Sequence, residues 1–196
     1  MPKPGSTLAI EEAARRAAAW EWAEVKLYEV TGSWARASGS SACKLYFDSA
    51  SQHHAWRAEL WCERLRGRLV PAYPVGPGGG SAPAPDLVEA PSEDAAKAAR
   101  SLSALMGDTG RLAAHCRVVL ARSVVGYRGW QEVCGRYADR PVARALSVAL
   151  ADVLADWEEA SAVLAEALDG GGAPAVAEAA KASAEADAAL FRWGFW

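Results

Sequence analysis

Hydrophobic residues recur at helical spacing along four long stretches of this chain. In the first, roughly residues 8–37, apolar side chains fall three or four positions apart and form one stripe. Similar stripes run through about 42–69, 111–137 and 140–168, whereas the alternation typical of strands is hard to find. The pattern therefore predicts an all-α protein with four long helices.

The connections between the stretches predict how they pair. "SGSS" separates the first two and "ADRP" the last two, so each pair should form an antiparallel hairpin. Six prolines and four glycines mark residues 71–93 as a loop, with a short helix, "DAAKAARSLSALM", expected near its end. We expect a helical bundle over residues 1–170, with a C-terminal helix and aromatic tail over 171–196 in the same domain.

Composition and charge narrow the functional classes. The 196 residues are 52% hydrophobic and carry a net charge of −3, which fits a globular domain without the basic face that nucleic-acid binding needs. The sequence contains no run of 18 apolar residues, so we expect no membrane span, and the N-terminal residues do not resemble a signal peptide. Four cysteines without CxxC spacing fit free thiols in the cytoplasm. The alanine, arginine and glycine bias is typical of a high-GC genome such as an actinobacterial one.

Two polar residues interrupt the apolar stripes of the first hairpin. Glu24 lies on the first stripe and His54 within the second. If the turn centres near Gly39, each lies 15 residues from it, so antiparallel pairing should place them opposite one another. An inward carboxylate must be paired, hydrogen-bonded or protonated. We therefore expect a Glu24–His54 pair, which could be an acid–base site or a structural ion pair.

Aromatic residues at a similar depth suggest a pocket around this pair. Trp20, Trp61 and Trp157 could form apolar walls, with His53 and Tyr127 as further substrate-binding candidates. Tyr28, one turn after Glu24, is a candidate hydrogen-bond donor in catalysis, a role that Tyr127 could also fill.

Three polar residues on the last two helices are expected at the edges of the bundle. His115 lies near the start of the third stretch, outside its apolar stripe. Asp152 and Asp156 flank the fourth stripe and are expected to face solvent, where Arg117 or Arg122 could neutralise them.

Two helical hairpins joined by a long connection resemble the ferritin-like superfamily over roughly residues 8–168. The resemblance implies a four-helix bundle, and in di-iron members a Glu on the first and third helices and Glu-x-x-His on the second and fourth. Glu24 matches the first ligand and His54 could represent a second-helix ligand. However, Ser51 and Ala50 stand where a glutamate would precede His54 and His53, the third helix has no acidic residue from 111 to 131, and the fourth has no histidine. We therefore expect a scaffold without its metal site and no cofactor.

These observations favour a metal-independent enzyme that performs acid–base chemistry, such as elimination, cyclisation or isomerisation, on a small molecule of bacterial secondary metabolism. In this hypothesis His54 moves the proton and Glu24 orients it. The alternative is a non-catalytic binding or partner subunit; an iron-dependent oxygenase with unconventional ligands is a third hypothesis. The tail "LFRWGFW" should bury Phe191, Trp193, Phe195 and Trp196 against the same chain or against a second subunit.

Overall fold

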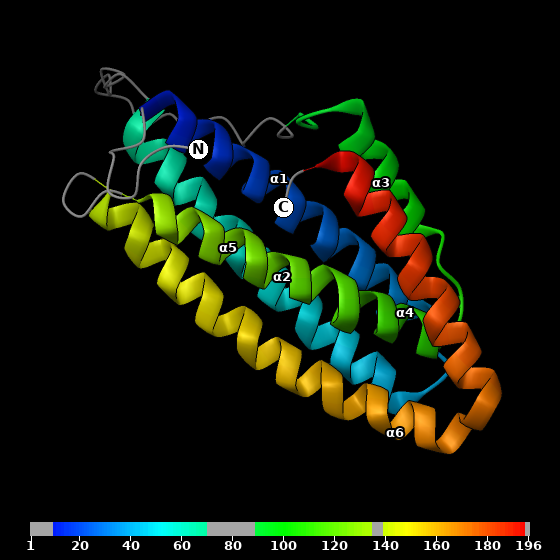
Figure 1. The fold of residues 1–196 in the computed structure, drawn as a ribbon. Coiled ribbons are helices and arrows are strands. Elements are labelled where there is room, and N and C mark those ends of the chain that lie inside the picture. Colours follow the sequence, from blue (N-terminus) through cyan, green and yellow to red (C-terminus); the bar gives the residue numbers. More distant parts are fainter. Residues whose placement is uncertain (1–9, 70–88, 135–138, 195–196) are drawn as a thin grey trace, which may run out of the picture.

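The computed structural model describes residues 10–69, 89–134 and 139–194, and across these ranges it is helical without strands (Figure 1). This confirms the predicted all-α class. Within the described ranges, none of the helices has the length and apolar character needed to cross a membrane. The elements in chain order are α1 (Ile10–Ala37), α2 (Ser41–Leu69), α3 (Glu93–Ser103), α4 (Asp108–Ala114), the π-helix η1 (His115–Leu120), α5 (Ala121–Val133) and α6 (Arg140–Trp193).

Two helical hairpins form the body of the molecule. Helices α1 and α2 pack along their lengths, and α4, η1 and α5 run on as one rod beside the first part of α6 (Figure 1). The short turn between α1 and α2 is held from the other hairpin, because Asp108 Oδ2 accepts the backbone N–H groups of Gly39 and Ser40 at 3.0 and 2.9 Å. The predicted loop over 71–93 lies mostly outside the described residues.

Helix α6 is divided into two arms by a sharp bend at Gly172. Its backbone angles there are φ 60° and ψ −149°, a conformation that is essentially restricted to glycine. The first arm, residues 140–171, belongs to the second hairpin, and the second arm, residues 173–193, returns beside α3 and α4 (Figure 1). Glu178 Oε1 on the second arm accepts the N–H of Gly110 at 2.9 Å, which ties the arm to the start of α4. The expected C-terminal helix is thus present as this second arm.

The aromatic tail only partly follows expectation. Trp193 packs edge-on against Trp22 of α1 with ring centroids 5.4 Å apart, as expected for docking on the same chain. The expectation that Phe191 is buried is wrong, since this side chain is 74% exposed. It lies on the outer face of the second arm, opposite the buried stripe that includes Ala186 and Leu190. Phe195 and Trp196 lie outside the described residues.

Candidate functional site

The site is built around the pair that the hairpin geometry predicts. His54 Nδ1 on α2 lies 2.6 Å from Glu24 Oε2 on α1, which confirms that the two residues are opposite one another. Both side chains are almost completely buried, at 1% and 0% exposure. Since neither group reaches solvent, the hydrogen-bonding needs of both must be met inside the bundle.

His115 and Tyr46 extend this pair into a chain of hydrogen bonds. His115 Nε2 lies 2.9 Å from His54 Nε2, and Tyr46 Oη lies 2.5 Å from His115 Nδ1. The expectation that His115 is an edge residue is therefore wrong, because its side chain is fully buried. His115 faces α2, where its ring also packs edge-on against those of Tyr46 and Phe47, so this side of the rod belongs to the interior of the bundle.

His115 is also the first residue of the π-helix η1. A π-helical turn has a wider hydrogen-bonding pattern than an α-helix, and such turns are frequent at functional sites. This local change rotates the side chains that follow relative to the regular α-helical periodicity used in sequence analysis. Neither the apolar stripe nor any motif in residues 111–120 indicated it.

On the other side of Glu24, Tyr127 hydrogen-bonds the second oxygen of the carboxylate. The Tyr127 hydroxyl donates to Glu24 Oε1 at 2.6 Å, and Trp61 Nε1 donates to the Tyr127 oxygen at 3.2 Å. The ring of Trp20 packs on that of Tyr127 with centroids 4.0 Å apart. Tyr28, by contrast, is 47% exposed, so the expected hydroxyl donor to the Glu24 region is Tyr127 rather than Tyr28.

A buried arginine that sequence analysis missed supplies the positive charge of the site. Arg57 has no solvent exposure; its Nε donates to Glu24 Oε2 at 3.2 Å, and its Nη1 donates to Asp156 Oδ2 at 2.7 Å and also contacts Asp152 Oδ2. The expectation that both aspartates form a solvated edge is wrong for Asp156, which is 3% exposed. Asp152 is intermediate, at 26% side-chain exposure.

Arg57, and not Arg117 or Arg122 as expected, neutralises Asp156. Arg122 instead donates to Asp187 on the second arm of α6. His53, a predicted substrate-binding residue, lies at the solvent-facing side of the cluster, where its Nδ1 is 2.6 Å from Asp156 Oδ1 and its side chain is 43% exposed. The cluster thus reaches from the closed core at His54 to partial solvent contact at His53.

Burial and charge together set the ionisation of these groups. Burial opposes ionisation of Glu24, but the charges of Arg57 and His54, with hydrogen bonds from His54 and Tyr127, lower its pKa from 4.5 to about 2. Burial lowers the pKa of His54, aided by Arg57 and opposed by Glu24, and burial lowers that of His115 much further.

The tyrosines and the arginine keep their protons. Burial raises the pKa values of Tyr46 and Tyr127 well above the usual value, and nearby carboxylates raise them further. Burial disfavours the charge of Arg57, yet Glu24 and Asp156 outweigh it and raise the guanidinium pKa. At neutral pH the site therefore holds ionised Glu24 and Arg57, two neutral imidazoles and two protonated hydroxyls.

These protonation states give the hydrogen-bond chain a single direction. Ionised Glu24 can only accept, so we assign the His54 proton to Nδ1, which lies 2.6 Å from Glu24 Oε2, and this leaves Nε2 as an acceptor. His115 then donates from Nε2 and accepts on Nδ1 from the Tyr46 hydroxyl. Arg57 Nη2 also faces His54 Nδ1 at 2.8 Å, so two donors meet there, which agrees with the lowering of the His54 pKa by Arg57. Proton donation runs from Tyr46 through His115 and His54 to Glu24, and we call these four residues the relay.

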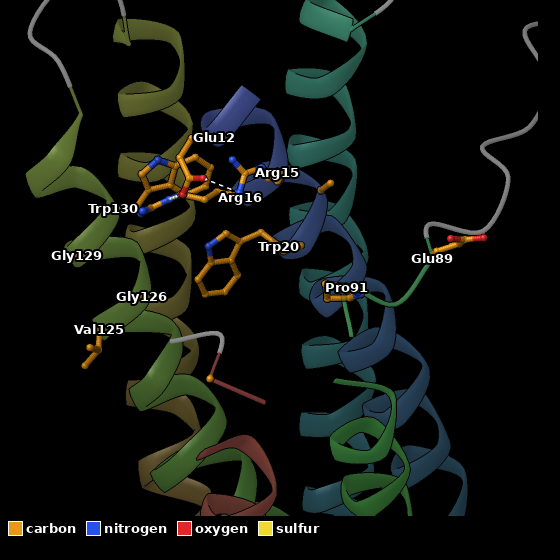
Figure 2. Close-up of a pocket in the computed structure, with 13 residues that line it drawn as sticks. Glu12, Arg15, Arg16, Trp20, Glu89, Pro91, Val125, Gly126, Gly129 and Trp130 are labelled. Atoms are coloured by element: carbon orange, nitrogen blue, oxygen red, sulfur yellow. Dashed lines mark hydrogen bonds and ion pairs between the residues drawn. The ribbon is translucent and has the colours of Figure 1, made fainter. Parts of the chain in front are cut away.

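The three tryptophans expected to line one pocket, Trp20, Trp61 and Trp157, lie in different surroundings. Trp61 is fully buried and Trp157 is partly buried against the core. Trp20 lines a pocket of about 730 Å³ between α1, α5 and residues 89–91, together with Trp130 (Figure 2). Of the predicted site residues, Glu24, His54, Trp20, Trp61 and Tyr127 are joined through direct contacts. His53 is linked to them only through Asp156 and Arg57, and Tyr28 is turned outward.

Within the described residues, no group of three or more histidine, cysteine, aspartate or glutamate side chains has an arrangement that could hold a metal ion. Comparison of the chain with protein-family models, with curated proteins and with solved structures finds no match.

Proposed function

We propose that this chain is an enzyme that performs metal-independent acid–base chemistry on a small organic molecule, with His54 holding the proton in transit. The observation that carries the proposal is the 2.6 Å contact between His54 Nδ1 and the buried carboxylate of Glu24, from which we assign the direction of the relay. A neutral imidazole whose Nδ1–H is held by a buried carboxylate is the arrangement in which histidine accepts a proton at its other nitrogen during general base catalysis.

The relay accepts a proton at its Tyr46 end. As the Tyr46 oxygen takes a proton from substrate, the Tyr46 hydroxyl proton passes to His115 Nδ1, and the His115 Nε2 proton passes to His54 Nε2. The substrate bond that held the proton leaves its electron pair on the substrate, and His54 becomes an imidazolium beside ionised Glu24 and close to Tyr127. Reversal of these transfers returns the proton to product. Because Tyr46 is 2% exposed, the proposal requires the start of α2 to separate from α6 when substrate binds.

Arg57 has a defined part in this chemistry. It holds Glu24 ionised, so the counter-ion of the imidazolium is present before the proton arrives. In the ferritin-like scaffold that we propose for this bundle, carboxylates of neighbouring helices surround metal cations. Here the guanidinium lies among Glu24, Asp152 and Asp156, and no step in the proposed mechanism needs a metal.

The test is exchange of substrate hydrogen with heavy water. The protein would be incubated in D2O with a library of small ketones, hydroxy acids and aromatic carboxylates, and deuterium incorporation would be read by mass spectrometry. We expect at least one compound to exchange, with His54→Gln and Tyr46→Phe slowing exchange about a hundredfold or more, in line with general acid–base contributions. Glu59→Gln, an exposed change on the same helix, is the matched control.

Equal exchange by the wild-type protein and His54→Gln, or no exchange across the library, would refute the enzyme hypothesis. The second candidate function is then a non-catalytic binding or partner subunit. The complete burial of Glu24, Arg57 and His115 favours it, because a buried polar network can fix the packing of helices without taking part in catalysis. In that case His54→Gln should change stability alone.

A further inference from the structure

The pocket between α1 and α5 is separate from the reactive end of the relay and has the character of a ligand site. Its floor is formed by the indole rings of Trp20 and Trp130, which are 3% and 2% exposed. Its volume of about 730 Å³ lies within the range typical of small-molecule sites, ~300–1,000 Å³.

Small residues on the two facing helices create this space. Helix α5 contributes Gly126 and Gly129, and α1 contributes Ala18 and Ala19. A Cβ atom built on Gly129 would meet nothing within 4 Å, so the missing side chain leaves open space rather than allowing close helix packing. The short side chains of α1 and α5 therefore leave open space beside the rings of Trp20 and Trp130, against which a flat ring system could stack.

The rim of the pocket carries two arginines, Arg15 and Arg16, in the first turns of α1. Glu12 accepts from Arg16 Nε at 2.8 Å and lies 3.0 Å from Arg15 Nη1, so one carboxylate faces two guanidinium groups. Each guanidinium has five N–H donors, and each of these two contacts uses one nitrogen, which leaves donors for another acceptor. Glu89, the other acidic residue of the lining, lies across the pocket and points away from this group (Figure 2).

A polar group on the floor also lacks a partner. Trp130 Nε1 is buried, and its N–H has no hydrogen-bond acceptor among the described residues. An orphan buried N–H costs about 1–3 kcal/mol in general. A ligand that places an oxygen at this end of the pocket could satisfy it, after a small movement of the side chains that cover it.

From these four observations we infer that the pocket binds a flat aromatic carboxylate, with its rings on the tryptophan floor and its carboxylate at the Arg15–Arg16 rim. Guanidinium groups bind carboxylates through charge-assisted, often paired hydrogen bonds. The inference does not depend on the relay being catalytic, since none of the relay residues lines this pocket.

The test is calorimetric titration of the full chain with 2-naphthoate and with its uncharged analogue, 2-naphthamide. We expect 2-naphthoate to bind about tenfold more tightly than the amide, the difference that one charge-assisted hydrogen bond of about 1.4 kcal/mol would give. Octanoate, which has the charge without the rings, should bind at least as weakly as the amide.

Two glycine variants locate the binding. Gly129→Leu fills this open space and should weaken 2-naphthoate binding about tenfold or more, by steric exclusion of the rings. Gly170→Leu, at a glycine of α6 whose added Cβ likewise meets nothing within 4 Å, should leave binding unchanged. Arg16→Gln should weaken binding of 2-naphthoate and leave that of 2-naphthamide as it was.

Equal affinity of wild type and Gly129→Leu for 2-naphthoate, equal affinity of the acid and the amide, or no detectable binding would each overturn the inference. None of these results bears on deuterium exchange at His54. Conversely, a His54→Gln protein that binds 2-naphthoate normally but is inactive supports both conclusions, so failure of one proposal can be told from failure of the other.

Discussion

Arg57 Nε donates a hydrogen bond to Glu24 Oε2 across 3.2 Å, and neither side chain has any solvent exposure. Each ion would be costly to bury alone, so the presence of one depends on the other. Asp156 adds a second buried carboxylate to the same guanidinium. One side chain of α2 therefore connects charges on α1 and α6, the two helices that flank it.

Replacing Arg57 should be among the most destabilising single changes in this chain. Arg57→Met keeps much of the volume but leaves Glu24 and Asp156 without their cation, and we expect unfolding free energy to fall by about 3–5 kcal/mol. Urea denaturation at pH 7 measures this loss. Arg144→Met, at an exposed position of α6, is the control and should stay within about 0.5 kcal/mol of wild type. A fall of less than about 1 kcal/mol for Arg57→Met would contradict this account.

Much of the fold follows from local sequence patterns. Apolar spacing placed the helices within a few residues, because burial of one face is what stabilises each helix in a bundle. The break at Gly172 follows from three consecutive glycines before Pro174. What local patterns could not supply was the position of the second arm of α6, which depends on contacts with α3 and α4 far away in the sequence.

The site was predictable only where the chain geometry is simple. Glu24 and His54 are equidistant from a short turn, so their contact could be derived by counting. Arg57 is three residues after His54 and thus on a neighbouring helical position, which is an available signal, but arginine is so rarely buried that its sequence position alone does not predict a place in the core. His115 could not be placed from local pattern, because its burial depends on contacts with His54 and Tyr46 of the other hairpin, 61 and 69 residues earlier in the chain.

Loss of the Tyr127 hydroxyl should weaken the fold measurably. Tyr127→Phe removes the donor to Glu24 Oε1 and the acceptor of Trp61 Nε1, and we expect unfolding free energy to fall by about 1–3 kcal/mol. Chemical denaturation of Tyr28→Phe provides the comparison, since Tyr28 is 47% exposed and its variant should resemble wild type. If the two variants lose the same amount, Tyr127 does not hold the carboxylate as described.

The direction of the relay predicts two different histidine tautomers in one protein. His54 should carry its proton on Nδ1 and His115 on Nε2, because Glu24 can only accept and Tyr46 donates to His115. Long-range proton–nitrogen correlation spectra of histidine-labelled protein at pH 7.5 distinguish the two forms. Tyr46→Phe should shift the His115 Nδ1 resonance, which would lose its donor. Finding His54 protonated on Nε2 instead would reverse the relay and remove the basis for the proposed chemistry.

Stability should fall in two stages as the solution is acidified. The pKa values of His54 and His115 are lowered by folding, so the unfolded chain takes up protons first, and stability declines as pH falls below 6.5. The Glu24 pKa is lowered from 4.5 to about 2, so its contribution is complete above 4.5 and is lost as pH falls towards 2. A shift of this size corresponds to about 3 kcal/mol.

The variant that isolates the second stage is Glu24→Gln. It cannot ionise, so its stability disadvantage relative to wild type should be largest above pH 4.5 and should shrink as the pH is lowered to 3. Urea midpoints collected at half-unit intervals from pH 7 to 3 measure the difference. Because Glu24 bonds His54 directly, altered titration of His54 adds to the gap as the pH falls below 6.5, whereas the loss of the Glu24 charge itself appears between pH 4.5 and 3. A gap that stays constant there would show that Glu24 has an ordinary pKa and that Arg57 does not hold it ionised.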